Sequence, residues 1–311
     1  MTSVSGSGGV SAVIVTYGRE RVLVDTVRRV LALDPPPSEL LVVDQTPRHA
    51  SDVERELEDM ATAGAIGWIR LARPSIPAAM NVGLRRARSE IVLFLDDDVI
   101  PDPGLIAAHG HAHHGGGASV VAGQVLQPGE EPVAGTPTPF RFNAGERRWV
   151  TEAIGANFSI RRDLALRIGG IDENFVRAAY GYEAELCARA IEAGARVLFE
   201  PAASVRHLRA PGGGTRSYGN HLRTIRPGHS VGAFYRILRT SRTAALPAKI
   251  ARRLARSIRT RHHLRRPWWI PVTLIAETLG LCWAIGLAAR GPRLLRAPAG
   301  KREGAAAEVS S

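Results

Sequence analysis

The chain has 311 residues, of which 45% are apolar and 23% are charged, so it can bury the core of one large domain or of two smaller ones. Its two cysteines, Cys187 and Cys282, form no metal-binding or redox pattern, which excludes cysteine-based sites of either kind and favours a reducing compartment. Residues 1–10 are rich in serine and glycine and lack the basic and apolar segments of a secretory signal. We therefore expect them to be disordered, and we expect no secretion.

Charge is distributed unevenly along the chain. Residues 1–205 hold 20 Lys and Arg against 26 Asp and Glu, whereas residues 206–311 hold 21 against three. The two parts carry net charges of −6 and +18, which together give the +12 of the whole chain. Such a basic C-terminal third indicates a polyanionic partner, either nucleic acid or an anionic membrane face.

Apolar runs alternate with helical periodicities through the first two-thirds of the chain. Strands are expected at 12–16, 40–43, 66–71, 91–95, 120–125 and 197–199. Helices are expected at 21–33, 50–63, 76–88, 162–168 and 180–193. Strands that alternate with helices indicate a parallel, wound sheet, so the predicted fold class is α/β.

The segment SEIVLFLDDDVIPDP, residues 89–103, is the most informative one. Its apolar run predicts a strand buried on both faces, and Asp96, Asp97 and Asp98 follow where that strand ends. In α/β proteins ligands bind at this edge of the sheet. Adjacent carboxylates repel one another unless a cation or hydrogen-bond donors compensate, and such oxygen ligands suit Mg²⁺ or Mn²⁺. A solvated acidic turn is the alternative, but the flanking strand and prolines favour a metal and phosphate site.

Four histidines follow, at positions 109, 111, 113 and 114. A metal cluster is one interpretation of them. Their spacing scatters them around a helix that three glycines end, so we expect a solvated surface helix instead.

Six segments resemble glycosyltransferase family 2 in their order and spacing. They are VIVTYGR, VVDQTP, AAMNVGLRRARSEIVLFLDDDVIP, GANFSIRRDLALRIGGIDENF, GYEAELCARAIEAGARVLFEP and VRH, spread over roughly residues 11–207. The resemblance implies the GT-A fold, a nucleotide-diphosphate sugar donor, a hydroxyl acceptor, Mn²⁺ or Mg²⁺ as cofactor, and inversion at the anomeric carbon.

The resemblance also implies roles for residues that follow the first strands. Thr16, Tyr17 and Arg19 lie just past the first strand, where they can hold the nucleotide. Asp44, after the second strand, can accept hydrogen bonds from a base N–H or a ribose hydroxyl, with a turn or N-cap aspartate as the alternative.

The acidic run matches the family's Asp-x-Asp motif. Asp96 is expected to face the ribose or the metal, Asp97 to border the donor, and Asp98 to bind the metal that bridges the two phosphates. His207 follows the last strand, where some GT-A enzymes have a third metal ligand or a phosphate contact. The alternative, favoured equally by the sequence, is that His207 has a purely structural role.

Two further donor contacts are expected from the resemblance. Asn81 matches the family's Arg-Asn-x-Gly, but Met80 replaces the arginine, so Arg73 or Arg85 is expected to compensate. Asn157 lies in a loop that borders the donor sugar and the acceptor in this family.

An inverting displacement needs a general base, which typically contributes ~10²–10⁴-fold. Glu183 aligns with the family's usual Asp base, although Tyr182 replaces the Glu that often precedes it. Glu185 is a second candidate. An ordinary exposed helix glutamate is the alternative for Glu183.

The basic C-terminal third contains two helical patterns. Residues 246–264 place apolar residues every four positions on a basic helix, a pattern that suits an anionic membrane surface. Residues 268–289 are apolar except for Glu277, which is costly in the middle of a membrane span. We therefore expect a monotopic helix, with a true span or a core helix as alternatives. Nucleic acid is not expected, because the segment lacks interleaved aromatic residues and any reading motif.

These inferences divide the chain into a disordered N-terminus (1–10), a GT-A catalytic domain (11–210), a basic helical membrane-associating region (211–296) and a disordered tail (297–311). We expect a glycosyltransferase of the hexosyltransferase type on the cytoplasmic face of the membrane, acting on a lipid-linked or cell-envelope glycan. A catalytically inactive membrane scaffold is one alternative. A sugar nucleotidyltransferase is the other, but it needs a glycine-rich basic loop that residues 16–19 do not supply.

Overall fold

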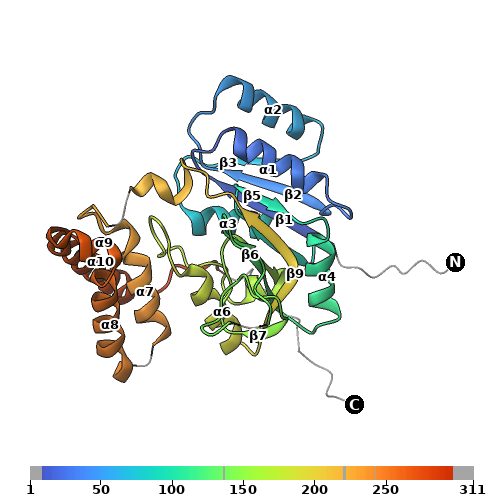
Figure 1. The fold of residues 1–311 in the computed structure, drawn as a ribbon. Helices are drawn as coiled ribbons and strands as arrows, with labels where there is room; N and C mark the ends of the chain where they lie inside the picture. The colour runs from blue at the N-terminus through green and yellow to red at the C-terminus, as the bar shows by residue number, and fades with distance from the viewer. Residues whose placement is uncertain (1–8, 136, 220–221, 242, 297–311) are drawn as a thin grey trace, which may run out of the picture.

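The computed structural model describes residues 9–135, 137–219, 222–241 and 243–296. The predicted disordered ends lie outside these residues, except for positions 9 and 10. Val10 already begins the first strand. The predicted α/β fold class is confirmed by one large sheet with helices on both faces (Figure 1).

Nine strands in the described residues form the sheet in the order β3-β2-β1-β4-β8-β6-β9-β5, and β7 also pairs with β9. The strands are β1 Val10–Thr16, β2 Glu39–Asp44, β3 Gly67–Arg70, β4 Ile91–Leu95, β5 Val99–Pro101, β6 Val120–Leu126, β7 Arg148–Val150, β8 Asn157–Arg161 and β9 Val197–His207. The helices are α1 Arg21–Leu31, α2 Ser51–Thr62, α3 Ile76–Arg86, α4 Leu105–His114, α5 Arg162–Arg167, α6 Tyr182–Glu192, α7 Val231–Thr240, α8 Leu246–Ile258, α9 Arg261–Arg265 and α10 Ile270–Ala289.

The first four strands are parallel, as the alternation of strands and helices predicts. β1 pairs with β2 on one side and with β4 on the other, and β2 pairs with β3. Beyond β4 the sheet is mixed, since β8 runs antiparallel to both β4 and β6. Thr16 and Asp44 are register partners, so the loops that follow β1 and β2 start at the same edge of the sheet.

Strand β9 differs from the prediction, which ended a strand at residue 199, just before Pro201. The strand instead runs to His207, because its register with β6 shifts between the Glu200 and Ser204 pairings. Pro201 lies in this bulge, where a missing N–H costs no ladder hydrogen bond. The extension matters for the site, because β9 then pairs with β5 and His207 lies opposite Val99.

Two apolar cores cover the two faces of the sheet, because successive side chains of each strand point to opposite faces. Helices α1, α2 and α4 pack on one face, together with Ala12 and Ile14 of β1. Helices α3, α5, α6 and α7 and part of α10 pack on the other face, together with Val13 of β1. Figure 1 shows α8, α9 and α10 as a group beside α7, at the end of the molecule away from α4.

The histidines of α4 correct the expectation of a solvated helix. His111 and His114 are exposed, but His109 and His113 are buried and both lie 2.8 Å from Ser159 Oγ. Burial lowers the pKa of His109 to about 4 and that of His113 to about 3, so both rings are neutral at pH 7. Periodicity alone missed them because their polar partner is on a strand far along the chain.

The C-terminal third is packed onto the sheet domain at both of its ends. Phe234 and Tyr235 of α7 belong to the core that covers α6. At the other end, the Arg293 N–H donates to Asp172 Oδ1 at 2.9 Å, and the Leu295 N–H donates to the Gly169 carbonyl at 2.7 Å. The basic helices are therefore held against the body of the protein rather than tethered to it by one linker.

Candidate active site

A cavity of about 290 Å³ lies at the carboxyl edge of β1 and β4. Of the residues that the sequence singled out, seven line it together with Glu183: Thr16, Tyr17, Arg19, Asp96, Asp97, Asp98 and His207. They come from the ends of three strands and from the first turn of α6. The sheet thus brings together side chains up to about 190 positions apart in the sequence.

Asp96, Asp98 and His207 form a three-residue cluster with the spacing of a metal site. One potential ligand atom from each lies within 4.8 Å of the others. The Nε2 atom of His207 is 3.1 Å from Asp98 Oδ1 and 3.6 Å from Asp96 Oδ2. The Asp98 side chain is 1% exposed, whereas that of Asp96 is 45% exposed, so one carboxylate is held fixed and the other faces the cavity.

Gln127 orients the His207 ring. The Nδ1 atom of His207 lies 3.1 Å from Gln127 Oε1, and that same oxygen accepts a hydrogen bond from Arg209 Nε at 2.8 Å. A side-chain amide oxygen only accepts hydrogen bonds, so Nδ1 carries the proton that it shares with Gln127. The opposite nitrogen therefore faces the two carboxylates, which is the arrangement found around metal-binding histidines.

Asp97 points away from this cluster. It accepts hydrogen bonds from Thr16 Oγ1 at 2.8 Å and from Arg19 Nε at 3.0 Å, and Arg19 Nη2 also lies 3.2 Å from Asp98 Oδ2. These contacts fasten the loop after β1 to the end of β4 and place one buried cation beside the acidic run. Arg19 therefore partly balances the carboxylates without reaching Asp96.

The pKa values of the three carboxyl groups in the acidic run are all shifted from their usual range. The walls of the cavity desolvate the Asp96 carboxylate, and the negative charges of Asp97 and Asp98 add to this effect, so the pKa of Asp96 is raised to about 7 although the positive charge of His207 opposes the shift. Burial raises the pKa of Asp97 to about 6. Burial also acts to raise the pKa of Asp98, but its hydrogen bond to His207 and the charges of His207 and Arg19 outweigh burial, so the pKa is lowered. Carboxylates packed in this way favour a bound cation over three separate negative charges.

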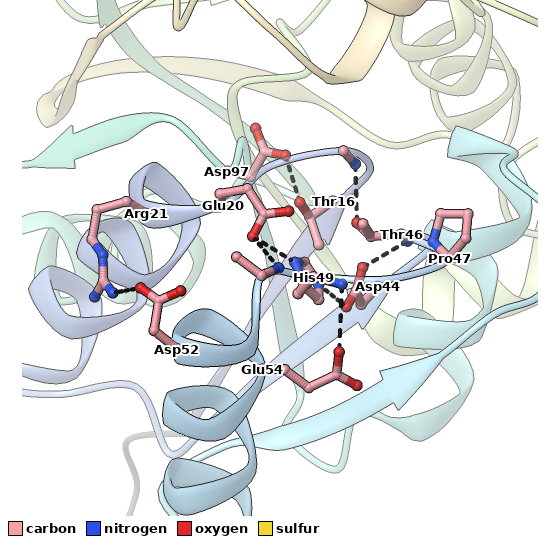
Figure 2. Close-up of polar contacts among 12 residues, drawn as sticks. Thr16, Glu20, Arg21, Asp44, Thr46, Pro47, His49, Asp52, Glu54 and Asp97 are labelled. Atoms are coloured by element: carbon pink, nitrogen blue, oxygen red, sulfur yellow. Dashed lines mark hydrogen bonds and ion pairs between the residues drawn. The ribbon is translucent and has the colours of Figure 1, made fainter.

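Asp44 lies outside the cavity, in the polar network of Figure 2. Its Oδ1 atom accepts from the Thr46 N–H at 2.8 Å, and its Oδ2 atom accepts from Trp68 Nε1 at 3.1 Å and lies 2.7 Å from His49 Nε2. The side chain is fully buried. Both oxygens have protein partners and the residue does not line the cavity, so the expected contact of Asp44 with the nucleotide stays a prediction. Instead, Gln45 lines the cavity next to it.

Three other predicted donor contacts also lie outside the cavity. Asn81 exchanges two hydrogen bonds of 2.8 Å with the backbone of Ile171. Asn157 is fully buried and donates to the carbonyls of Gln124 and Ala203. These two side chains join separate parts of the chain, and their expected contacts with the donor stay predictions. Arg73 is exposed beside the cavity without lining it.

The two candidate bases differ in their surroundings. Glu183 stands at the start of α6 and lines the cavity, where the Gly155 N–H donates to its Oε1 atom at 3.3 Å. Burial raises the pKa of Glu183 to about 7. Glu185 is instead 2% exposed and forms two 2.8 Å bonds with Arg189, so it does not reach the cavity. Of the two candidates, only Glu183 lines the cavity, so the assignment of a base among them stays a prediction that this position favours for Glu183.

A loop after β9, residues 208–218, closes one side of the cavity and was not singled out as part of the site. The Gly214 N–H donates to the Tyr17 carbonyl at 2.7 Å, and Arg19 donates to the carbonyl groups of Ala210 and Gly212. A side chain at Gly213 would collide with the Gly18 carbonyl, and its φ of +73° also favours glycine. Three consecutive glycines, at positions 212–214 shortly after the last strand, were the available signal.

The sequence pattern of the family described as Glycosyl transferase family 2 matches residues 11–169, about half of the chain. The chain belongs to glycosyltransferase family 2. The match contains the acidic run but ends before Glu183 and His207, so the structure is what connects those two residues to the rest of the site.

Curated relatives of this family 2 glycosyltransferase act in different settings. The glucosyl-dolichyl phosphate glucuronosyltransferase of Haloferax volcanii is 28% identical over 218 residues, which cover 64% of this chain and 68% of the relative. The pre-mycofactocin glycosyltransferase of Mycobacterium tuberculosis is 35% identical over 146 residues, which cover 42% of this chain and only 29% of the relative.

Solved structures confirm the GT-A fold of this family 2 enzyme. The mannosyltransferase PcManGT from Pyrobaculum calidifontis, in complex with GDP-Man and Mn²⁺, gives a TM-score of 0.56 at 18% identity and covers 92% of this chain and 80% of its own. GalNAc-T7 with UDP, GalNAc and Mn²⁺ gives 0.54 at 16% identity, covering 65% and 44%. S. aureus TarS gives 0.55 at 15% identity, covering 82% and 44%.

Proposed function

We propose that this glycosyltransferase moves a sugar from a nucleotide-diphosphate donor to an acceptor hydroxyl with inversion, using a divalent cation and Glu183 as general base. One observation carries the proposal. The cluster of Asp96, Asp98 and His207 lines the same cavity as the carboxyl group of Glu183, whose pKa is raised. Neither group alone specifies a displacement at a sugar carbon. Together they provide a side that could hold a cation, and through it the diphosphate of the donor, and a side that can accept a proton.

The donor set of the cluster fits Mn²⁺ or Mg²⁺. Two carboxylates and an imidazole held by Gln127 converge, and carboxylate oxygens suit both ions. When bound, such an ion supplies positive charge that stabilises the departing nucleoside diphosphate. Arg19 adds a fixed cation beside the same carboxylates, which it holds in place through Asp97 and Asp98.

Glu183 takes the proton of the acceptor hydroxyl as the acceptor oxygen bonds to the anomeric carbon. The bond from that carbon to the donor's phosphate oxygen breaks in the same displacement, and the nucleoside diphosphate leaves. A direct displacement of this kind inverts the anomeric configuration. The pKa of about 7 suits a base that must accept a proton near neutral pH.

Membrane attachment through α10 extends this proposal. The helix and the residues before it, Pro267–Ala289, are long and apolar enough to cross a membrane, with a mean hydropathy of 1.8. Apart from Leu287, the side chains that α10 buries against the protein are small or polar, whereas Ile275, Leu279 and Ile285 are each about half exposed. The polar face is covered by the neighbouring helices, so we propose that the apolar face lies on a membrane and that the helix does not cross it.

The flanks of α10 favour an anionic membrane. Arg265 and Arg266 precede the apolar segment, and Arg290 follows it, all three exposed. Trp268 is 66% exposed at the same end as the two arginines, a position typical of side chains at a membrane interface. Each basic residue near such a surface adds about 1 kcal/mol to binding. We propose the cytoplasmic leaflet as this surface.

A lipid-linked acceptor follows from that location. An enzyme whose apolar helix lies on the bilayer meets acceptors whose reactive hydroxyl is held at the same surface. The Haloferax volcanii relative carries a dolichyl phosphate in its name, which supports this acceptor class without identifying the sugar.

The proposed function is tested with purified full-length protein and a panel of nucleotide sugars, in Mn²⁺, in Mg²⁺ and in chelator. We expect slow, metal-dependent hydrolysis of one donor, with a released sugar whose initial anomeric configuration is opposite to that of the donor. Retention of configuration would contradict the direct displacement. No turnover of any donor would instead favour the inactive scaffold.

A further inference from the structure

A second cavity, of about 610 Å³, lies between α7, α8 and α10 and is strongly basic. The described residues that line it include a single carboxylate, Glu277, and five cations. These cations are Arg236, Lys249, Arg252, Arg253 and Arg256. The catalytic mechanism uses none of these side chains.

Most of this positive charge is not neutralised within the part of the chain that the structure describes. Arg253 pairs with Glu277 at 3.0 Å, but Arg236, Arg252 and Arg256 form no ion pair with any described residue. Like charges gathered around one hollow repel one another, so an anion bound between them is stabilised. Arginine is suited to phosphate because its planar group offers paired N–H donors.

Two buried polar atoms in the same place support a ligand site. The Nε atom of Arg253 and the Oε2 atom of Glu277 are buried, and neither has a hydrogen-bond partner. Such groups are rarely left unpaired in a folded protein unless a ligand or water satisfies them. A phosphate group can accept from Arg253, and a hydroxyl on the same ligand can donate to Glu277.

The basic cavity is linked by shared wall residues to the cavity at the carboxyl edge of β1 and β4, which we call the donor cavity. A third cavity of about 280 Å³ shares Arg253 and Glu277 with the basic cavity. Its wall also includes Tyr180, which lines the donor cavity as well. The three hollows therefore follow one another from the acidic run to the basic helices.

We propose that the basic cavity binds a phosphate or diphosphate group of the acceptor, an inference that rests on the proposed transferase function. The acceptor's reactive hydroxyl would then extend past Tyr180 toward Glu183. A lipid headgroup and a soluble sugar phosphate share this chemistry. Helix α10 forms one wall of the cavity through Thr273 and Glu277 and exposes apolar side chains on its outer face, which favours the lipid.

The site is tested by titrating the full-length protein with inorganic pyrophosphate in a calorimeter. Chelator is present so that metal-dependent binding at the acidic run does not contribute. The variant Arg252→Gln/Arg256→Gln removes two cations from the cavity wall. Arg259→Gln/Arg261→Gln is the matched control, since these exposed arginines carry the same charge nearby but do not line the cavity. We expect the first pair to weaken binding at least about tenfold and the control to leave it nearly unchanged.

Equal weakening in the two double variants would overturn the site, because it would show binding to net charge alone. No binding of pyrophosphate to the wild type would overturn it as well. Donor hydrolysis, measured in Mn²⁺ on the same preparations, is expected to persist in both double variants. If the wild type hydrolyses no donor, the proposed function is contradicted. The pyrophosphate titration then still decides whether the basic cavity binds phosphate.

Vesicles distinguish the two sources of the phosphate. Neutral vesicles that contain a polyprenyl phosphate are compared with neutral vesicles that contain the same fraction of phosphatidylglycerol. Stronger binding to the first kind, reversed by pyrophosphate, assigns the cavity to a lipid headgroup. Pyrophosphate binding without any preference between the vesicles assigns it to a soluble sugar phosphate.

Discussion

In the proposed mechanism, Glu183 is the residue on which the chemistry depends most directly. Glu183→Gln keeps the shape of the side chain but cannot accept a proton. We expect kcat for transfer to fall by roughly 10²–10⁴-fold, while donor affinity changes little. Glu185→Gln is the matched control. It breaks a structural pair with Arg189, so it should lower stability more than it lowers kcat. A Glu183→Gln enzyme with unchanged kcat would exclude this residue as the base.

The pH dependence follows from the same carboxyl. Burial raises the pKa of Glu183 to about 7, so the group is protonated and inactive as a base below that pH and ionised above it. The rate of transfer should therefore rise as the pH increases through about 7. The Glu183→Gln variant should lack this rise. A wild-type profile that is flat between pH 5 and 9 would contradict the assignment.

Asn157 is a predicted donor contact whose side chain bonds only to protein groups in this structure, so its two possible roles can be tested. Asn157→Ala leaves the carbonyls of Gln124 and Ala203 and one ring nitrogen of His109 without their partner. Each orphaned buried group costs about 1–3 kcal/mol, so the free energy of unfolding should drop by at least that amount. Denaturant titration measures the drop, and donor affinity in the folded fraction should be retained. A stable variant that fails to bind donor would support the predicted contact.

The sequence shows where acidic residues follow a strand, but it does not show which hydrogen-bond partners their side chains have. The three aspartates after an apolar strand indicated an acidic cluster correctly, because three adjacent residues stay together in any fold. Asp44 carries the same kind of signal at the end of β2. Its carboxylate is nevertheless occupied by Trp68, 24 positions away, and by His49. No local pattern shows which aspartate is already satisfied.

At the scale of elements, the loop after β9 is the least expected part of the site. Gly213→Ala introduces a side chain at a left-handed position that also approaches the Gly18 carbonyl. The left-handed backbone alone costs about 1–2 kcal/mol, so the loop should move and the KM for donor should rise about tenfold. Gly212→Ala is the control, since nothing lies within 4 Å of its added carbon. Equal KM values for the two variants would show that the loop does not border the donor.

Strand β9 shows why boundaries were less predictable than the existence of elements. The apolar start of the strand is visible in the sequence. The predicted strand nevertheless ends at residue 199, before Pro201, where proline is a common end of a strand. The bulge that accommodates this proline depends on the register with β6, which is a tertiary property. The extra length brings His207, which the sequence already marked as a possible metal ligand, beside Asp98. What the sequence did not show is the strand that holds it there.

Across the whole molecule, the charge asymmetry corresponds to a division of labour. The acidic body contains the donor cavity, and the basic helices contain the proposed acceptor-phosphate cavity and the exposed apolar face of α10. Composition predicted the sign of the net charge of each part. It could not predict that α7 and residues 293–295 are packed into the body, because those contacts are made by side chains and backbone groups far apart in sequence.

The proposed attachment to the membrane involves the whole molecule and can be measured with vesicles. Ile275→Glu places a charge on the apolar face of α10, and binding to anionic vesicles should weaken about tenfold or more, since burying such a side chain contributes about 1.5–3 kcal/mol. Ile191→Glu makes the same change on α6, where the side chain is similarly exposed, and should have little effect. Equal binding of the two variants would contradict the proposed orientation.

The most direct test of the account is a titration of the purified protein with Mn²⁺, with donor binding measured in parallel. The matched variants are Asp98→Ala and Asp102→Ala, since Asp102 is an exposed aspartate close by that belongs to no cluster of ligands among the described residues. We predict that the wild type and Asp102→Ala bind the ion and require it for tight donor binding, and that Asp98→Ala loses both. Undiminished Mn²⁺ binding by Asp98→Ala, or tight donor binding in chelator, would contradict the central claim.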